Sequence, residues 1–163
     1  MFSTLKPVIY VQISPERLTL KNVKTGQTID EAPEVAISAP PKRKILAVGS
    51  QARQAAALQG AEIVNPFAHP RSLVSDFIVA EQLLKHQLGR LLGYSRLLIM
   101  PCVVMHPLES PAGGFTQIEL KALREMALGA GASEVHLCNG RPLTDEEVLA
   151  RDPADGRWID ASS

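Results

Sequence analysis

The sequence lacks the features that mark several specialised classes of protein. Basic and acidic side chains number 17 each, so there is no charge excess to attract a nucleic acid. Cysteine occurs only twice, at Cys102 and Cys138 inside apolar runs, where a free thiol packs as a small hydrophobe. The N-terminus has no basic segment before a long apolar run, which predicts neither a signal peptide nor a membrane span. We therefore expect a cytoplasmic protein with no nucleic-acid partner and no integral membrane segment.

What is present is the composition of an ordinary globular domain. Apolar residues make up 45% of the chain and charged residues 21%, which argues against intrinsic disorder. A chain of 163 residues normally forms one domain and buries roughly 70% of the surface that its unfolded form exposes. The chain therefore needs no disulfide to support a core.

The first third of the sequence predicts short antiparallel strands. An apolar, β-branched run is closed by Ser14-Pro15 and followed by an alternating segment, which is typical of a hairpin. Pro40-Pro41 interrupts the next pair of strands. The expected elements are strands at residues 8–13, 17–23, 34–38 and 44–48, a short helix at 50–58 and a brief strand at 63–64.

The remainder predicts helices that alternate with strands. Helices are expected at 75–92 and 116–129, and the nearly continuous apolar run at 96–105 is typical of a central strand covered on both faces. A last strand is expected at 135–138. The residues expected to face the core are Phe77, Ala80, Leu84, Leu88 and Leu91 in the first helix and Ile118, Ala122, Leu123 and Met126 in the second.

Together these elements predict an α/β domain with a mixed sheet, antiparallel N-terminal strands and flanking helices. We place this domain at residues 1–140. Residues 141–163 differ in character, with several acidic side chains and a short helix that opens at Thr144. We expect an acidic tail that Trp158 and Ile159 anchor on the domain, because burying an indole is favourable.

The segment from Gly114 to Leu137 reads GFTQIELKALREMALGAGASEVHL. It resembles a passage of the MreB-type bacterial actin homologues that has a Thr, a Glu three residues later, a helix with Ala, Arg and Glu, an Ala-Gly-Ala turn and a Val-x-Leu strand. Shorter similarities occur in the same order at residues 32–37, 47–49, 65–66 and 74–77. The resemblance spans about residues 8 to 140. It implies an actin-like, ribonuclease H-type single domain, which in that family is the first of two.

The phosphate loop of that family is replaced in this sequence. Where the family reads Asp-x-Gly-Thr, this chain reads Gln12-Ile13-Ser14-Pro15. Gln12 brings no charge to a magnesium shell, Ser14 adds a side chain where glycine lets the backbone approach phosphate, and Pro15 removes an N–H donor. The family's second phosphate loop and adenosine pocket lie in its second half, and we expect neither in this chain. The resemblance therefore implies a degenerate loop, no bound cofactor and no binding of ATP.

Glu119 aligns with the family's glutamate that positions the water attacking the γ-phosphate. Thr116 and Glu119 also have the spacing of a helix capping box, which stabilises a helix terminus by about 1 kcal/mol. Thr144 and Glu147 repeat this spacing where no chemistry is expected. We interpret Glu119 and Thr116 as a vestige of the family's site with a capping role, so no catalytic residue is predicted.

The remaining glycine, basic and histidine patterns do not predict a ligand-binding site. The loop at 106–115 has paired glycines but no Lys-Ser/Thr after them, so it is expected to be a surface loop. The basic residues 42–44 are expected to be solvated, and residues 1–5 offer at most a slight peripheral contact with a membrane. No metal site is predicted, because the histidines lie on different elements without a Cys/His or His/Glu cluster. These histidines are His69, His86, His106 and His136.

Three classes of function compete. The favoured one is a non-catalytic interaction module related to the bacterial actin cytoskeleton and cell shape, a pseudo-ATPase that binds a protein partner or itself through an exposed apolar patch. The second is an ATPase completed by a second chain, with Glu119 as the water-positioning base. A nuclease is discarded, because residues 8–14 contain no carboxylate for a two-metal site. The candidate interface residues are Pro101, His106, Leu108 and Phe115.

Overall fold

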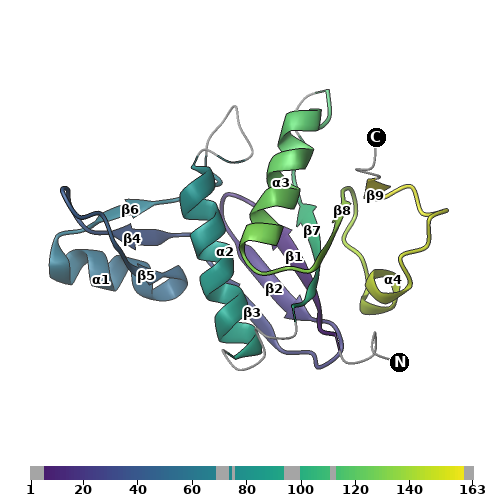
Figure 1. The fold of residues 1–163 in the computed structure, drawn as a ribbon, viewed down its shortest axis with the longest axis horizontal. Coiled ribbons are helices and arrows are strands. Elements are labelled where there is room, and N and C mark those ends of the chain that lie inside the picture. Colours follow the sequence, from purple (N-terminus) through teal and green to yellow (C-terminus); the bar gives the residue numbers. More distant parts are fainter. Residues whose placement is uncertain (1–5, 69–73, 75, 94–99, 111–112, 160–163) are drawn as a thin grey trace.

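The computed structural model describes residues 6–68, 74, 76–93, 100–110 and 113–159. These residues form two sheets, a larger one and a smaller one beside it (Figure 1). The larger sheet has the order β3 (Thr28–Glu31), β2 (Leu18–Asn22), β1 (Val8–Ile13), β7 (Cys102–Pro107), β8 (Glu134–Cys138) and β9 (Trp158–Ile159). The smaller sheet has the order β5 (Ile45–Val48), β4 (Val35–Ile37) and β6 (Glu62–Val64). The helices are α1 (Ala52–Gln59), α2 (Phe77–Leu92), α3 (Gln117–Gly129) and α4 (Asp145–Ala150), with a 3₁₀ turn, η2 (Gly49–Gln51), before α1.

The larger sheet is mixed, as the sequence predicts. β1 pairs with β2 antiparallel and with β7 parallel, and β7 pairs with β8 parallel. The N-terminal hairpin is therefore confirmed, and β7 lies in the middle of the sheet between β1 and β8. The expected central strand also included residues 96–99, which lie outside the described residues.

The sheets differ from the expectation in two respects. Residues 28–31 form the edge strand β3, which the sequence pattern did not reveal because Ile29 is its single apolar residue. The strands expected at 34–38 and 44–48 do not extend the main sheet but form the smaller sheet together with β6. Pro33, which has no N–H to donate to a ladder, lies where the chain passes from one sheet to the other.

The central strands are buried on both faces. α2 and α3 lie over one face of the larger sheet (Figure 1). Side chains alternate along a strand, and Val11 and Met105 belong to the main core on this face. Tyr10 and Val104 point to the opposite face, into a second apolar cluster. The side chains that close this second cluster come from the segment 143–159. We call this opposite side of the sheet the tail face.

The two long helices begin and end where capping signals place them. The Asp76 side chain accepts a hydrogen bond from the Val79 amide at 3.1 Å at the start of α2, and Gly93 follows its last residue with a φ of 78°. α3 begins after Thr116. The predicted core residues Ala80, Leu84, Leu88, Leu91, Leu123 and Met126 are buried.

Two residues of these helices were predicted wrongly as core residues. Phe77 is 36% exposed and Ile118 is 81% exposed, whereas Leu83 and Leu120 are buried. Phe77 and Ile118 each lie in the first turn of a helix, and the first turn of α3 extends past the end of the sheet (Figure 1). A regular spacing of three and four therefore marks the correct face but not where the sheet beneath it ends.

Gly49 lies where the two sheets meet and no side chain fits. It follows β5 with a φ of 65°, and a Cβ atom on it would overlap the carboxylate of Glu31. That carboxylate accepts hydrogen bonds from Ser50 at 2.7 Å, Gln87 at 2.9 Å and Arg90 at 2.8 Å. Burial opposes ionisation of Glu31, but these hydrogen bonds outweigh it and lower the pKa to about 2. One charged group thus connects β3 with α2 and with the 3₁₀ turn η2 that follows the smaller sheet.

We predict that Gly49→Ala lowers the free energy of unfolding by about 2–4 kcal/mol, because it adds overlap with Glu31 to the strain of a positive φ. Gly60→Ala is the matched control, since Gly60 has a φ of 67° and nothing within 4 Å of an added Cβ. This control should cost about 1 kcal/mol. Urea unfolding of both variants measures the difference, and equal losses would contradict the proposed close contact.

Candidate functional site

The candidate site is the end of the larger sheet at which the parallel strands β1 and β7 finish. In open α/β sheets, ligands bind outside the carboxyl ends of such strands. The sequence Gln12-Ile13-Ser14-Pro15 ends β1, and residues 14–17 form the turn into β2. This turn stands where the resemblance places a phosphate loop.

The turn uses its polar groups internally. The Ser14 amide donates to the Arg17 carbonyl oxygen at 3.0 Å, and the Arg17 amide donates to the Ser14 hydroxyl oxygen at 3.0 Å. Pro15 has no N–H, and its carbonyl oxygen accepts a hydrogen bond from the Asn65 amide group at 2.8 Å. Of the four residues at 14–17, Pro15 therefore has no backbone N–H, and the N–H groups of Ser14 and Arg17 donate within the turn. A phosphate would find little to bind, because phosphate loops hold it with free backbone N–H groups.

The Arg17 side chain is also engaged. Its Nε donates to the Asp30 carboxylate at 2.9 Å and its Nη2 to the Asp30 carbonyl oxygen at 2.8 Å. The hydrogen bond from Arg17 lowers the pKa of Asp30, and a second one from Thr19 acts in the same direction. Both partners are exposed, so this pair adds little stability, but it holds the guanidinium away from the turn.

Thr116 and Glu119 form the capping box that their spacing predicts. The Thr116 hydroxyl oxygen accepts from the Glu119 amide at 3.1 Å, and the Glu119 carboxylate accepts from the Thr116 amide at 3.3 Å. The Thr116 hydroxyl also lies 3.0 Å from the same carboxylate oxygen. Thr144 and Glu147 form a second capping box at α4. The carboxylate of Glu119 is thus engaged at its own helix terminus.

His106 is buried in a hydrogen-bonded chain that reaches the segment after β8. Its Nε2 lies 3.0 Å from the Gly140 carbonyl oxygen, which can only accept, so Nε2 carries the proton. Its Nδ1 then accepts from the Tyr10 hydroxyl at 2.5 Å, and the Tyr10 oxygen accepts from the Leu143 amide at 3.0 Å. Burial lowers the pKa of His106 and raises the pKa of Tyr10 to about 12. Both side chains are therefore neutral at pH 7 and hold the chain where it leaves the sheet.

The candidate interface residues differ in solvent exposure. Pro101 and His106 are buried, and a buried side chain offers nothing to a partner. Phe115 is partly buried and packs against the main core, while Leu108 is 40% exposed. The expectation of an interface near these four residues therefore narrows to Leu108 and the exposed part of Phe115.

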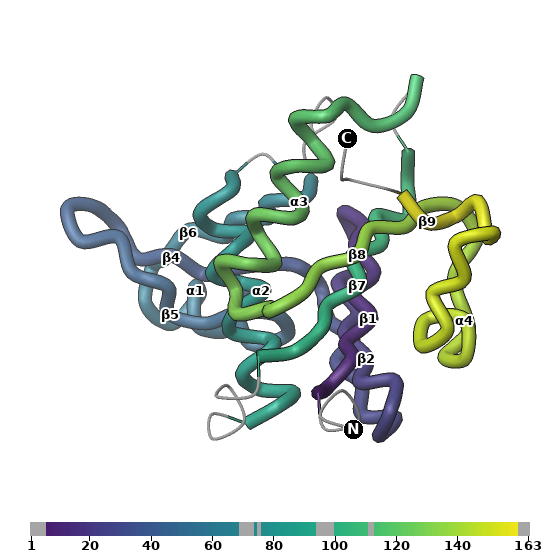
Figure 2. Tube along the Cα trace, turned by 45° about the vertical axis from the view of Figure 1, so that its right-hand side comes forward, coloured from purple at the N-terminus to yellow at the C-terminus, as the bar shows by residue number. Residues whose placement is uncertain are grey.

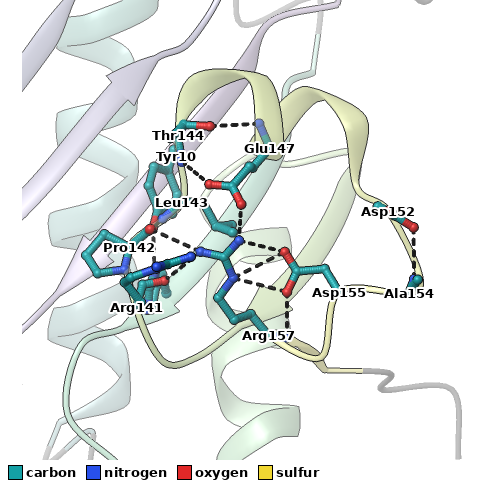
Figure 3. Close-up of polar contacts among 11 residues, drawn as sticks. Tyr10, Arg141, Pro142, Leu143, Thr144, Glu147, Asp152, Ala154, Asp155 and Arg157 are labelled. Carbon is teal, nitrogen blue, oxygen red and sulfur yellow. Dashed lines mark hydrogen bonds and ion pairs between the residues drawn. The ribbon is translucent and has the colours of Figure 1, made fainter.

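Arg157 holds the two ends of the loop that contains α4 together (Figure 3). Its guanidinium donates to the carboxylates of Glu147 and Asp155, the latter at 2.6 Å, and to the carbonyl oxygens of Arg141 and Pro142 at 3.3 and 3.2 Å. Hydrogen bonds from Arg157 lower the pKa of Asp155 to about 2. A single side chain thus joins both sides of the loop that contains α4.

The strand β9 completes this arrangement. It lies beside β8 (Figure 2) and pairs with it antiparallel. Trp158 packs against the tail-face cluster, in which Leu143 and Val148 are buried. Burying such aliphatic side chains contributes about 1.5–3 kcal/mol each. The short helix and the anchoring residues Trp158 and Ile159 that the sequence suggests for this segment are present.

The expectation that no histidine joins a cysteine or a glutamate was wrong. The side chains of Cys102, Glu134 and His136 converge on the tail face. Glu134 and His136 are two residues apart on one strand, so their common face could have been read from the sequence. Cys102 comes from another strand, and the register that sets it opposite Glu134 is not visible in the sequence. Burial raises the pKa of the Cys102 thiol to about 11, so the free thiol is protonated at pH 7.

Comparison with known proteins supports the resemblance. The sequence matches the MreB/Mbl protein family over residues 18–144. The fold is similar to two crystal structures of MreB5 of Spiroplasma citri, one bound to ADP and one to AMPPNP, each at 19% identity, with TM-scores of 0.62 and 0.63. These matches cover 81% of this chain but only 37% and 38% of the MreB5 chains. Comparison with curated proteins gives no significant match.

The structural likeness confirms the predicted actin-like α/β fold with a mixed sheet and flanking helices. Within the ranges that the structure describes, no helix is both long and apolar enough to cross a membrane.

We predict that Arg157→Gln loosens the segment 143–159, because a neutral amide cannot replace the guanidinium's bonds to Glu147 and Asp155. Trp158 is the single tryptophan of the chain, so its fluorescence reports this change directly. Its emission should shift to longer wavelength and become more accessible to a soluble quencher.

Arg53→Gln is the control for this test. It removes an arginine that binds the Glu34 carboxylate at 2.8 Å in the region of the smaller sheet, and it should leave the Trp158 emission unchanged. Identical spectra for Arg157→Gln and the wild type would show that Arg157 does not hold the segment.

Proposed function

The chain belongs to the MreB/Mbl family, and we propose that it acts as a non-catalytic, actin-like interaction module of the bacterial cytoskeleton. In this proposal the module works in the cytoplasm, contributes to cell shape, and has lost the ATPase activity of its family. The observation that carries the proposal is the turn at residues 14–17, in which the Ser14 and Arg17 amides bond within the turn and Pro15 has no N–H.

The differences between this chain and MreB5 support this proposal. The two MreB5 structures contain ADP and AMPPNP, so that protein binds adenine nucleotides. This chain spans little more than a third of the length of those proteins, and at the end of β1 it has Gln12 where an acidic residue would organise magnesium. Retained fold and altered turn together favour binding to proteins over binding to nucleotide.

Exposed apolar side chains support self-association. α2 and α3 begin at the same end of the sheet, where β1 and β7 finish (Figure 1). Near this end Ile78 is 73% exposed, Ile118 is 81% exposed and Leu108 is 40% exposed. Apolar side chains that gather at one end of a domain favour an interface. We propose that a second copy of this chain, or another actin-like subunit, contacts this end.

The alternative is an ATPase that a second chain completes. It is favoured by one observation, the presence of Glu119 at the position of the family's water-positioning glutamate. Against it stands the engagement of that carboxylate by Thr116. A catalytic role would require the carboxylate to leave the cap, at a cost of about 1 kcal/mol.

We predict that calorimetric titration with Mg-ATP gives no saturable binding, since the turn offers no phosphate cradle.

Sedimentation at several protein concentrations should show a discrete dimer or a larger species. Ile118→Lys should shift this equilibrium toward the monomer, because it places a charge at the proposed interface. Lys85→Ala serves as a control for a surface change on α2. Binding of ATP at micromolar concentration would favour the ATPase alternative. A protein that stays monomeric at all concentrations would contradict the proposal of self-association.

We further predict that Thr116→Ala lowers the free energy of unfolding by about 1 kcal/mol through loss of the cap. Thr144→Ala, which removes the same cap at α4, should cost a similar amount. Glu119→Gln should cost less, because an amide oxygen still accepts the hydrogen bond. Neither the wild type nor any of these variants should release phosphate from ATP, and a turnover that Glu119→Gln abolishes would assign Glu119 a catalytic role.

A further inference from the structure

Three potential metal ligands meet on the tail face, at the end of the sheet where β7 and β8 begin. In the parallel register Cys102 stands opposite Glu134, and Val104 stands opposite His136. Glu134 and His136 are two residues apart on one strand, so both side chains point to the same face as Cys102. The Sγ, carboxylate oxygen and imidazole nitrogen atoms of the three residues all lie within 4.8 Å of one another.

The spacing of these atoms is close to that of a metal site. The Cys102 Sγ lies 3.8 Å from the Glu134 Oε2, and the His136 Nε2 contacts the same oxygen. Zinc bonds of about 2.0 Å to nitrogen or oxygen and about 2.3 Å to sulfur put neighbouring ligand atoms roughly 3.3–3.6 Å apart. Small side-chain movements therefore suffice to place an ion between the three groups.

The ligand types select a class of ion. A thiolate and an imidazole suit zinc and similar borderline-soft ions, whereas magnesium and calcium prefer oxygen ligands alone. Cys102 itself is buried, but the side chains of Glu134 and His136 are 39% and 33% exposed, which gives an ion a path from solvent.

We propose that Cys102, Glu134 and His136 bind one divalent cation of the zinc class, with water as the fourth ligand. The site is independent of the proposed loss of nucleotide binding, since it lies at the opposite ends of β7 and β8 from the turn at 14–17. Its occupation would join the first residues of two central strands through an ion.

Arg151 links this site to the segment that covers the tail face. Its guanidinium lies 3.5 Å from the Cys102 Sγ and 3.6 Å from a Glu134 oxygen, and Lys6 lies 3.5 Å from the other Glu134 oxygen. A bound cation would compete with Arg151 for both groups. Metal binding would therefore displace a side chain at the end of α4 and loosen its attachment to the sheet.

Cobalt(II) tests the proposal on the full-length chain, because a cobalt–thiolate bond gives a charge-transfer absorption band in the near ultraviolet. We expect this band in the wild type, with displacement of cobalt by zinc. The rings of Trp158 and His136 are nearly perpendicular, with centroids 6.4 Å apart, so cobalt should also quench the single tryptophan.

Matched variants identify the ligands. Cys102→Ser should abolish the band, whereas Cys138→Ser, which removes the other buried thiol, should leave it intact. His136→Gln, at a partly exposed position, should weaken zinc binding by at least about 100-fold. Removing a residue that only hydrogen-bonds to a metal ligand already lowers metal affinity about 10- to 100-fold, and a ligand itself should matter at least as much. Arg151→Gln should tighten binding several-fold by removing a competing positive charge.

The absence of a band in the folded wild type would overturn the proposal. A band that survives Cys102→Ser, or that Cys138→Ser removes, would also overturn it. If Cys102→Ser does not fold, the zinc affinity of His136→Gln decides, and an affinity equal to that of the wild type rejects the site.

Discussion

The structure depends on the burial of β1 and β7 on both faces. Every residue of β7 is buried, and β1 contributes Ile9 and Val11 to one face and Tyr10 to the other. Two parallel strands in the middle of a sheet have no free surface, so each face needs its own cover. α2 and α3 cover one face and the segment 143–159 covers the other. The positions of the helices, the turn at 14–17 and the tail all follow from this requirement.

The two covers are held in different ways. The helices pack by an apolar stripe, with residues such as Leu84 and Leu123 wholly buried. The segment 143–159 combines a small apolar contact, made by Leu143, Val148 and Trp158, with polar attachments such as the hydrogen bond from the Leu143 amide to Tyr10. Polar attachments of this kind can be exchanged for other partners, whereas a packed core cannot open without losing several kcal/mol. The tail face, where Cys102, Glu134 and His136 meet, is therefore the side on which we propose that an ion acts on the structure.

Membership of the MreB/Mbl family and the altered turn lead to one functional picture. The fold keeps the central sheet and its helices, which need only apolar residues at the correct spacing. Nucleotide binding needs particular groups at one turn, and there Ser14 and Arg17 bond to each other. A surface turn tolerates many sequences provided its polar groups find partners, as the Ser14 and Arg17 amides do here. We propose that this protein retains the scaffold as a surface for association.

The sequence by itself determined the hairpin, the two long helices, the capping boxes and the family, because these depend on local spacing or on residues close in the chain. It predicted Leu84 and Leu123 correctly as core residues but also Phe77 and Ile118, since periodicity does not reveal where a sheet ends. Only the tertiary structure decided that residues 35–48 leave the main sheet, that Tyr10 bonds to His106, and that Cys102 meets Glu134 and His136. The reason is that strand order and register join residues far apart in the chain, and no local pattern encodes those pairings.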